Sequence, residues 1–176
     1  DTPNVKRYPL AVRQTRYAGE WVVAVVAETR AQAEDAAEKV RVSYEPLPYV
    51  TNAEEALKPE SPPVHPEHGS NVLLDKTFVW GEVEKDFAES PRHLSFRVTW
   101  GRNSTVPIET FGVVASWDSW REVLDVWASI QMPKYSDQIA RALRIPANNV
   151  RVHHDVDVGG SYGVKRGIKH TVLCAY

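Results

Sequence analysis

The segment 159–163, Gly-Gly-Ser-Tyr-Gly, constrains the fold of this chain more than any other, because it directly follows a valine-rich stretch that ends at Val158. Glycine lets the backbone adopt positive φ and lets a large ligand approach main-chain N–H groups. Successive N–H groups at such a turn form a concavity that binds anions. The segment therefore predicts a strand that ends in a ligand-binding turn, which is typical of two sites: a hydrolase nucleophile and a cofactor cradle.

The composition is that of an ordinary folded chain. Its 176 residues are 43% hydrophobic and 25% charged, enough for one domain or two small ones. The net charge of −2 gives no reason to expect nucleic acid or an anionic membrane as a partner. Cys174 is the single cysteine, which excludes an internal disulfide and favours a reducing, cytoplasmic compartment. No stretch reaches the ~18 apolar residues that a membrane helix needs.

The first part of the chain predicts a β-α-β unit. Residues 21–27 form a continuous apolar run, as expected of a strand covered on both faces. Thr29 stands at a helix N-cap position, and residues 31–40 have small apolar residues at helical spacing. Residues 40–44 alternate and predict the returning strand, and residues 52–57 predict a short helix.

A stretch with four prolines, residues 58–69, predicts an extended linker. We therefore expect one domain over residues 1–60, a linker over 61–70 and a second domain over 71–176. In the second domain the pattern predicts helices near 81–89 and 136–143, a strand beginning at Phe78, and further strands at 93–100, 111–117, 122–128 and 150–158. The strands 111–117 and 122–128 flank a short polar turn, so we expect an antiparallel hairpin.

Two chemistries compete for the glycine segment and its surroundings. Residues 159–163 fit the G-x-S-x-G pattern of a serine hydrolase, but that mechanism needs an acid and a histidine after the serine. Only His170 follows Ser161, with no aspartate or glutamate. His153 and His154 suggest a metal site, but alternation along a strand sends them to opposite faces. The simpler interpretation is a core His154 and a surface His153, with no metal ligand in the chain.

Four blocks resemble, in the same order, segments of the large subunit of the molybdenum hydroxylases, the group of xanthine dehydrogenase, aldehyde oxidase and aerobic carbon monoxide dehydrogenase. Residues 17–48 are similar to the α/β-hammerhead segment "GQPVAAVVAET…A…AA" and its following strand. Residues 107–115 resemble the opening of the molybdopterin-binding domain, residues 126–131 its "STQ" strand end, and residues 159–165 its "GGGFGxK" loop. The resemblance implies an α+β fold, with a partial hammerhead followed by the first part of a mixed α+β molybdopterin-binding domain.

The resemblance also assigns roles to residues. Gln131 takes the position of a glutamine that hydrogen-bonds to an oxo ligand of molybdenum. The glycine loop contacts the cofactor through backbone N–H groups and places its aromatic side chain over the metal; here it comprises Gly159, Gly160, Ser161, Tyr162 and Gly163. The general base of the family is a glutamate near the C-terminus of the subunit. No residue here matches it, so the catalytic residue stays unassigned and the chain is interpreted as a piece of a longer subunit.

Three of the departures from the family pattern concern the predicted site. Ser161 replaces a glycine and Tyr162 a phenylalanine, and we predict that the tyrosine hydroxyl contacts the ligand sphere of the metal or a substrate. Arg166 stands where purine-binding members carry a glutamate, which makes it a candidate substrate-binding residue. A guanidinium cannot accept hydrogen bonds from purine N–H groups, which argues against xanthine as a substrate.

The implied reaction is the oxidation of an aldehyde, an N-heterocycle or a similar small substrate with oxygen from water. The implied cofactor is molybdopterin in its cytosine dinucleotide form. FAD and [2Fe-2S] groups are expected on partner subunits, because this chain has no cysteine cluster to bind iron–sulfur. The rest of the large subunit is a further expected partner, whereas nucleic acid and membrane are not. A serine hydrolase and a non-catalytic assembly module remain the alternatives.

Overall fold

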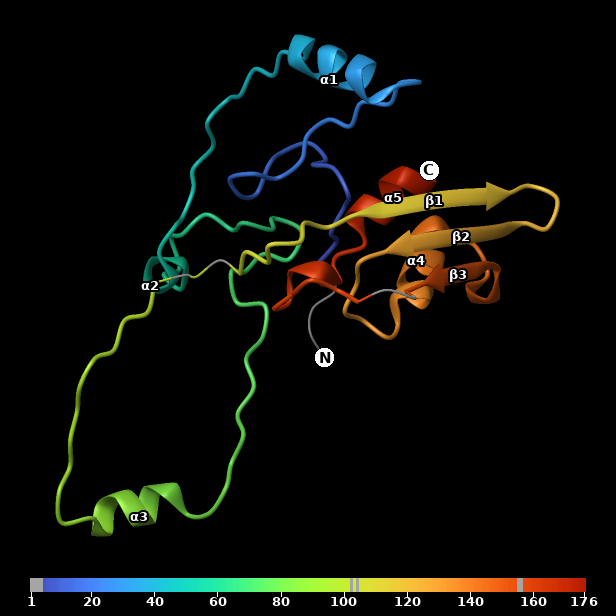
Figure 1. Ribbon diagram of the computed structural model, residues 1–176. Helices are drawn as coiled ribbons and strands as arrows, with labels where there is room; N and C mark the ends of the chain where they lie inside the picture. The colour runs from blue at the N-terminus through green and yellow to red at the C-terminus, as the bar shows by residue number, and fades with distance from the viewer. Residues whose placement is uncertain (1–4, 102, 104, 155–156) are drawn as a thin grey trace. The chain divides into compact units, whose positions relative to one another are not determined.

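Figure 1 shows the computed structural model of the chain, which describes residues 5–101, 103, 105–154 and 157–176. The described residues form a mixed helix and strand structure, as predicted. Its strands are β1 Val113–Asp118, β2 Val123–Ala128 and β3 Val150–His153, and its helices are α1 Arg30–Lys39, α2 Ala53–Ala56, α3 Val83–Glu89, α4 Tyr135–Leu143 and α5 Lys169–Ala175, with the 3₁₀-helices η1 Ala147–Asn149 and η2 Val164–Arg166. The chain divides into two units: Asp1–Val5 with Pro46–Asn103, and Lys6–Glu45 with Ser104–Tyr176.

The second unit contains a sheet with the strand order β1-β2-β3. β1 and β2 pair antiparallel from Val113↔Ala128 to Asp118↔Val123, which confirms the predicted hairpin. The Asp118 carboxylate closes its turn by accepting the backbone N–H groups of residues 120 and 121 at 3.0 and 3.1 Å. β2 and β3 pair parallel, and α4 lies in the crossover connection that a parallel pair requires.

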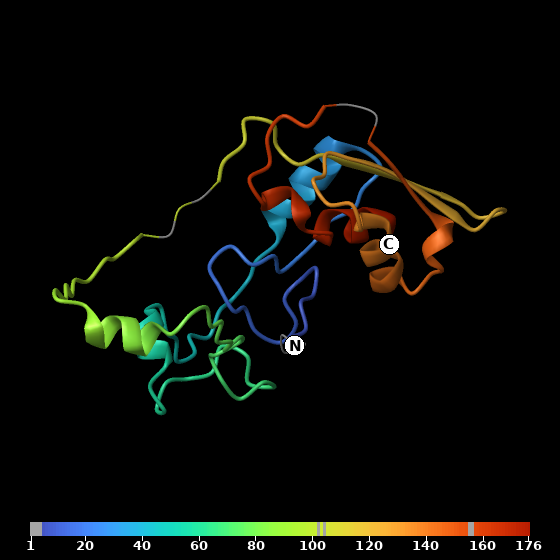
Figure 2. The same ribbon diagram turned by 90° about the horizontal axis from the view of Figure 1, so that it is seen from below.

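The core of this unit lies between one face of the sheet and the helices α4 and α5, and Figure 2 shows both helices on the same side of the sheet. Leu124 and Val126 of β2 point into this core and are 1% and 0% exposed. Ile139 of α4 is fully buried against them. Leu124 and Val126, two positions apart on β2, therefore face the helices, whereas Asp125 between them is only partly buried.

Helix α1 begins where the sequence predicts it to begin. The Thr29 hydroxyl accepts the N–H of Gln32, and the Gln32 side chain accepts the N–H of Thr29, which forms a capping box. The strands predicted on either side, residues 21–27 and 40–44, are not formed. A strand needs a neighbour for its backbone hydrogen bonds, and no other described segment pairs with either one along its length. The side chain of Val26 is accordingly 91% exposed.

The other unit, which includes Pro46–Asn103, contains the predicted helices α2 and α3. The Asn52 side chain caps α2 by accepting the N–H groups of residues 54 and 55. The proline-rich stretch folds back as a loop rather than running extended, because the Asn71 side chain donates to the carbonyls of Ala56 and Pro62, both at 3.1 Å. The strands predicted from Phe78 and over residues 93–100 are not formed, since no described segment supplies a pairing partner.

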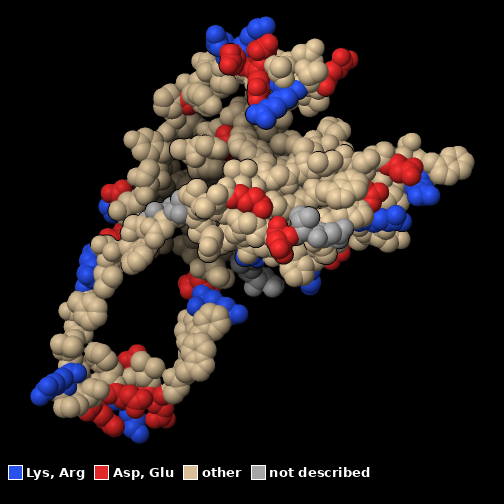
Figure 3. Space-filling view, in the orientation of Figure 1, with Lys and Arg blue, Asp and Glu red and all other residues tan. Residues whose placement is uncertain are grey.

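Charged side chains of both signs are interspersed over α1 and over α3, as Figure 3 shows. On α1 the guanidinium of Arg30 lies 2.7 Å from the carboxylate of Glu34, and beside α3 the ammonium of Lys85 lies 3.5 Å from that of Glu82. Such exposed pairs are worth little stability. α1 also has its capping box, whereas α3 has no side-chain cap and no buried residue. Among the helices of the described residues, none is long and apolar enough to cross a lipid bilayer.

Candidate cofactor-binding site

The structure brings Gln131 and the glycine turn together, although they are about thirty residues apart in the sequence. Gln131 follows the end of β2, and its backbone N–H donates to the carbonyl of Lys165 at 3.3 Å. Its side-chain Oε1 accepts the N–H of Gly163 at 2.7 Å and the hydroxyl of Ser161. One carboxamide oxygen, the Oε1 of Gln131, therefore connects the segment after β2 to the glycine turn that follows β3.

These contacts decide which way the Gln131 carboxamide points. A backbone N–H can only donate, so the atom facing Gly163 must be the carbonyl oxygen and not the NH₂ group. The Nε2 hydrogens then point away from the turn backbone, and no described residue accepts a hydrogen bond from them. Because Gln131 is exposed, its NH₂ group is available as a neutral donor to a ligand.

The backbone of the turn has the conformation that its glycines predict. Gly160 has φ +89° and Gly163 has φ +99°, values that strain residues with a side chain. Tyr162 also has a positive φ, +50°, and its side chain is 76% exposed. Hydrogen bonds to other described residues engage the N–H groups of Gly160 and Gly163 but not those of Ser161 and Tyr162. The turn therefore presents two consecutive N–H donors that have no acceptor among the described residues.

Sequence reasoning missed a fixed ion pair beneath the turn. Glu109 accepts the N–H of Gly159 at 2.7 Å and pairs with the ammonium of Lys165, whose side chain is 1% exposed. The Lys165 hydrogen bond, and then that of Gly159, hold the pKa of Glu109 below its usual range. Both residues lie in blocks that carry the family resemblance, but 56 positions separate them, so spacing cannot reveal their contact.

The remaining predicted site residue, Arg166, lies in η2 directly after Lys165 and is exposed. No ion pair joins its guanidinium to another described residue. It is therefore a cation with no ion-pair partner among the described residues, and none of their contacts connects it to Gln131.

The geometry does not support a serine nucleophile. The Ser161 hydroxyl donates to Gln131 and accepts the N–H of Lys165 at 3.3 Å. The single downstream histidine, His170, packs between the rings of Trp21 and Phe111, with centroids 4.5 and 4.4 Å away. Burial, and secondly the charge of Lys169, lowers the pKa of His170. Among the described residues, His170 therefore packs against aromatic rings and does not contact Ser161 as a base would.

The two adjacent histidines are arranged differently from the prediction. β3 ends at His153, whose ring lies 2.7 Å from the Asp125 carboxylate and stacks on Trp127. His154 follows the strand and is exposed, so the expectation of a core histidine there is wrong. The strand is shorter than predicted, and alternation no longer governs a residue outside it. Within the described parts of the chain, no three His, Cys, Asp or Glu residues are grouped to hold a metal ion.

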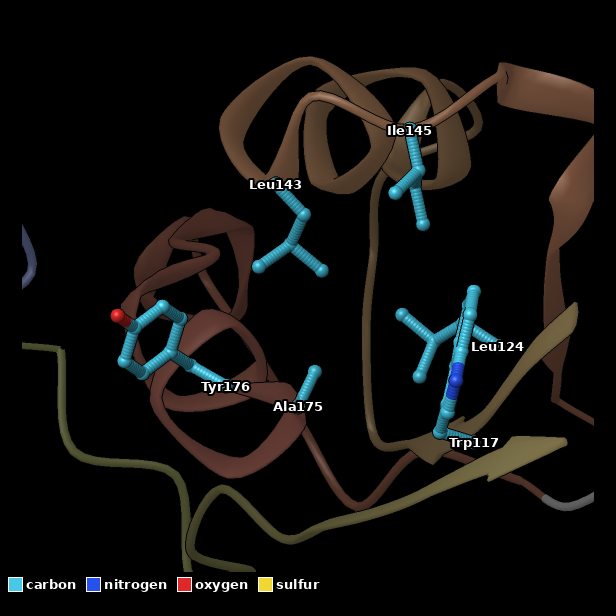
Figure 4. A pocket seen from close by; sticks show the side chains of 6 residues that line it. All are labelled: Trp117, Leu124, Leu143, Ile145, Ala175 and Tyr176. Atoms are coloured by element: carbon cyan, nitrogen blue, oxygen red, sulfur yellow. The ribbon is translucent and has the colours of Figure 1, made fainter. Parts of the chain in front are cut away.

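An apolar pocket of about 240 Å³ lies elsewhere in the same unit, and Figure 4 shows side chains of the sheet, α4 and the end of α5 around it. Its lining residues are Trp117, Leu124, Leu143, Ile145, Ala175 and Tyr176. None belongs to the turn, and the lining has no acidic or basic side chain. This pocket therefore shares no residue with the site formed by Gln131 and the turn, and it offers no charged group to a ligand.

Comparison with known families agrees with the sequence blocks. Residues 64–176 match the family described as "Molybdopterin cofactor-binding domain". Residues 2–48 match the family described as "Aldehyde oxidase and xanthine dehydrogenase, a/b hammerhead domain". The chain belongs to the molybdenum hydroxylase family. Gln131 and the glycine turn both lie within the residues that match the cofactor-binding domain of this family.

Individual members of the molybdenum hydroxylase family show the same similarity. The chain is 38% identical over 161 residues to the 6-hydroxypseudooxynicotine dehydrogenase complex subunit gamma of Paenarthrobacter nicotinovorans, covering 90% of this chain and 20% of that protein. It is 32% identical over 180 residues to the carbon monoxide dehydrogenase large chain of Hydrogenophaga pseudoflava, covering 94% and 22%. The chain thus spans about a fifth of the length of these relatives.

A solved molybdenum hydroxylase has the same arrangement of elements. The quinoline 2-oxidoreductase of Pseudomonas putida 86 matches with a TM-score of 0.80 and 35% identity. The match covers 95% of this chain and 21% of the other. The fold of the chain is therefore that of a hammerhead and cofactor-binding segment of this family, as the sequence blocks indicate.

Proposed function

We propose that this chain is part of the molybdopterin-binding subunit of a molybdenum-dependent hydroxylase, and that its glycine turn and Gln131 together bind the cofactor. The observation that carries the proposal is the Gln131 Oε1 atom, which accepts the Gly163 N–H at 2.7 Å and the Ser161 hydroxyl. These contacts place a side-chain donor beside backbone donors. We assign residues 1–60 to the hammerhead, 61–70 to a linker and 71–176 to the cofactor-binding domain.

The donors fit a group that carries oxo and phosphate oxygens. The Nε2 of Gln131 has no acceptor among the described residues and would donate a neutral hydrogen bond to an oxo ligand without adding charge there. The free N–H groups of Ser161 and Tyr162 suit anionic or carbonyl acceptors. The bound cofactor supplies the redox chemistry, oxidation of a small substrate with oxygen from water, while these residues bind and orient it.

Arg166 and Tyr162 are the proposed contacts to the substrate side of the site. The exposed guanidinium of Arg166 donates but cannot accept hydrogen bonds, so it cannot bind the N–H groups of xanthine, but it can donate to the acceptor atom of an aldehyde, an N-heterocycle or a similar small molecule. The exposed Tyr162 side chain would contact, through its hydroxyl, the ligand sphere of the metal or the substrate. A Tyr162→Phe enzyme with unchanged substrate range and rates would contradict its role.

The complete enzyme has further parts. We propose the cytosine dinucleotide form of molybdopterin, and FAD and [2Fe-2S] groups on partner subunits, because Cys174 is the single cysteine of this chain. The relatives are named as a "complex subunit gamma" and a "large chain", which supports a multi-subunit assembly. The rest of the large subunit supplies the general base, and a single cysteine is consistent with a cytoplasmic enzyme.

Substitution of Gln131 tests this function in the assembled enzyme. Gln131→Glu retains an oxygen for Gly163 but replaces the NH₂ donor with a negative charge, so molybdenum and pterin content should fall by roughly tenfold. Gln138→Ala, at an exposed glutamine of α4, is the matched control and should retain full content. Metal analysis and pterin fluorescence measure both.

Two outcomes would overturn the proposal. A wild-type enzyme without molybdenum would remove the cofactor, and equal content in Gln131→Glu would remove the role of the carboxamide. Covalent labelling of Ser161 by a fluorophosphonate would instead support the serine hydrolase. Absence of both metal and labelling would leave the assembly module.

A further inference from the structure

Glu109 contacts both ends of the glycine turn with its two carboxylate oxygens. Oε2 accepts the N–H of Gly159, the first residue of the turn, at 2.7 Å. Oε1 pairs with the ammonium of Lys165, two residues after the last glycine of the turn. One side chain from the segment before β1 therefore holds the entry and the exit of the turn at once.

The Lys165 end of this arrangement is deeply buried. The side chain of Lys165 is 1% exposed, whereas that of Glu109 is 37% exposed. A buried ammonium is strongly unfavourable unless it is paired and hydrogen-bonded, and Glu109 is its partner among the described residues. Lys165 therefore cannot leave Glu109 without disturbing the backbone that carries it.

The Gly159 end is packed without free space. A Cβ atom at Gly159 would lie 2.6 Å from the Glu109 Cβ and 2.8 Å from its Oε2. The carboxylate therefore lies directly beneath the first peptide of the turn, which explains why a glycine stands there. The pKa of Glu109 is held below its usual range by Lys165 and then by Gly159, so the group stays ionised at neutral pH.

Hydrogen bonds connect Lys165 of the ion pair to Gln131. The N–H of Lys165 donates to the Ser161 hydroxyl at 3.3 Å, and that hydroxyl donates to the Oε1 of Gln131. The carbonyl of Lys165 accepts the backbone N–H of Gln131 at 3.3 Å. A shift of Lys165 therefore moves both the turn and the carboxamide.

We propose that Glu109 is a positioning residue that sets the shape of the turn by holding Gly159 and Lys165 simultaneously, so that the free N–H groups and the Gln131 carboxamide are preorganised for the cofactor. The benefit to cofactor binding rests on the proposed function, whereas the ordering of the turn by Glu109 does not. In this role Glu109 acts through its contacts with Gly159 and Lys165. Preorganised donors bind better because no ordering is needed when the ligand arrives.

The test is hydrogen–deuterium exchange of the peptides over residues 157–166, together with the rate of cofactor loss, in the assembled enzyme with and without cofactor. Glu109→Gln should accelerate exchange of these peptides and cofactor loss by roughly tenfold, because the NH₂ of glutamine opposes one of the two donors. The control is Glu54→Gln, which breaks the pair of Glu54 and Arg97 whose side chains are 71% and 70% exposed. It should change neither quantity.

A second variant separates positioning from simple stability. Glu109→Gln with Lys165→Met removes the unpaired buried charge and should restore the unfolding midpoint. It should not restore slow cofactor loss, because the exit of the turn is no longer held. If the double variant regains wild-type cofactor retention, or if Glu109→Gln exchanges like wild type, the positioning role is wrong.

The two proposals fail in different ways. If the wild-type enzyme contains no molybdenum, the proposed function fails, and exchange over residues 157–166 in the cofactor-free protein still decides whether Glu109 orders the turn. If molybdenum is present and Gln131→Glu loses it while Glu109→Gln does not, the function stands and the role of Glu109 fails.

Discussion

Two regions of this molecule contain apolar side chains at alternate positions, but these side chains are buried in one region and exposed in the other. In β2, Leu124 and Val126 lie on either side of Asp125 and are 1% and 0% exposed in the core with α4 and α5. In the other unit, residues 93–100 alternate polar and apolar side chains more regularly than β2 does, yet Phe96 is 80% exposed and Trp100 is 82% exposed. β2 has hydrogen-bonded neighbours on both sides, and residues 93–100 have none among the described segments. Alternation therefore shows that a segment can become a strand, and a partner decides whether it does.

The largest expected effect compares the two regions directly. Ile139→Ala in the buried core should lower the free energy of unfolding by about 2–5 kcal/mol, because it removes transfer energy and leaves a cavity. Phe96→Ala should change it by no more than about 0.5 kcal/mol, as expected of an exposed side chain. Urea unfolding followed by tryptophan fluorescence measures both. A loss above about 2 kcal/mol in Phe96→Ala would break the comparison, because it would show that residues 93–100 are buried in solution.

The same contrast explains what the sequence could predict about the fold. The hairpin of β1 and β2 and the helix after Thr29 depend on neighbours a few residues away, so alternation, turn residues and caps predicted them correctly. Residues 21–27 and 40–44 require a partner that no described segment supplies, so their apolar runs predicted strands that do not form. The parallel pairing of β2 with β3 depends on a crossover through α4 and had no local signal.

The residues of the candidate site also differ in whether a local sequence pattern could predict them. The glycine turn was visible because positive φ restricts residue choice at Gly160 and Gly163. Gln131 was visible only through resemblance to a family, since an isolated glutamine has no distinctive pattern. Glu109 was missed as a site residue because its contacts with Gly159 and Lys165 cross 50 and 56 positions. These contacts form only when the folded sheet brings the segment before β1 close to the segment after β3.

A second prediction sharpens the contrast within the packed region. The Tyr135 hydroxyl is 2.8 Å from that of Thr171, which is 0% exposed, and donates to the Gly167 carbonyl at 3.3 Å. Tyr135→Phe leaves these groups without a partner and should lower the free energy of unfolding by about 1–3 kcal/mol. Tyr49→Phe, at a side chain that is 82% exposed, is the control and should be neutral in the same urea titration. Equal stability of the two variants would mean that water replaces the lost hydroxyl.

A third, smaller effect concerns the site. Ser161→Ala removes the hydroxyl that donates to Gln131 and accepts from Lys165, whereas the Gly163 N–H still holds the same carboxamide oxygen. We expect a loss of about 0.5–1.5 kcal/mol in the free energy of unfolding. Molybdenum content should fall only partly, and Ser119→Ala in the exposed hairpin turn should match wild type in both measurements. Complete loss of metal in Ser161→Ala would mean that the hydroxyl, rather than the turn backbone, dominates binding.

The smallest effect is a pH dependence where the segment before α1 meets α5. His170 packs against Trp21, and burial, followed by the charge of Lys169, lowers its pKa. The unfolded chain takes up a proton near the ordinary value of about 6.5, while the folded ring remains neutral down to its lowered pKa. The unfolded state then binds more protons, so the free energy of unfolding decreases as pH falls through this window.

His170→Phe keeps an aromatic ring but cannot titrate, so it should flatten this decline between about pH 7.5 and about pH 5.5. The effect is small because the His170 ring is only partly buried, so solvent screens the charge that it acquires. Urea unfolding at the two pH values measures it. Identical declines in wild type and His170→Phe would show that the ring is not buried in solution, and that its packing against Trp21 and Phe111 is not maintained there.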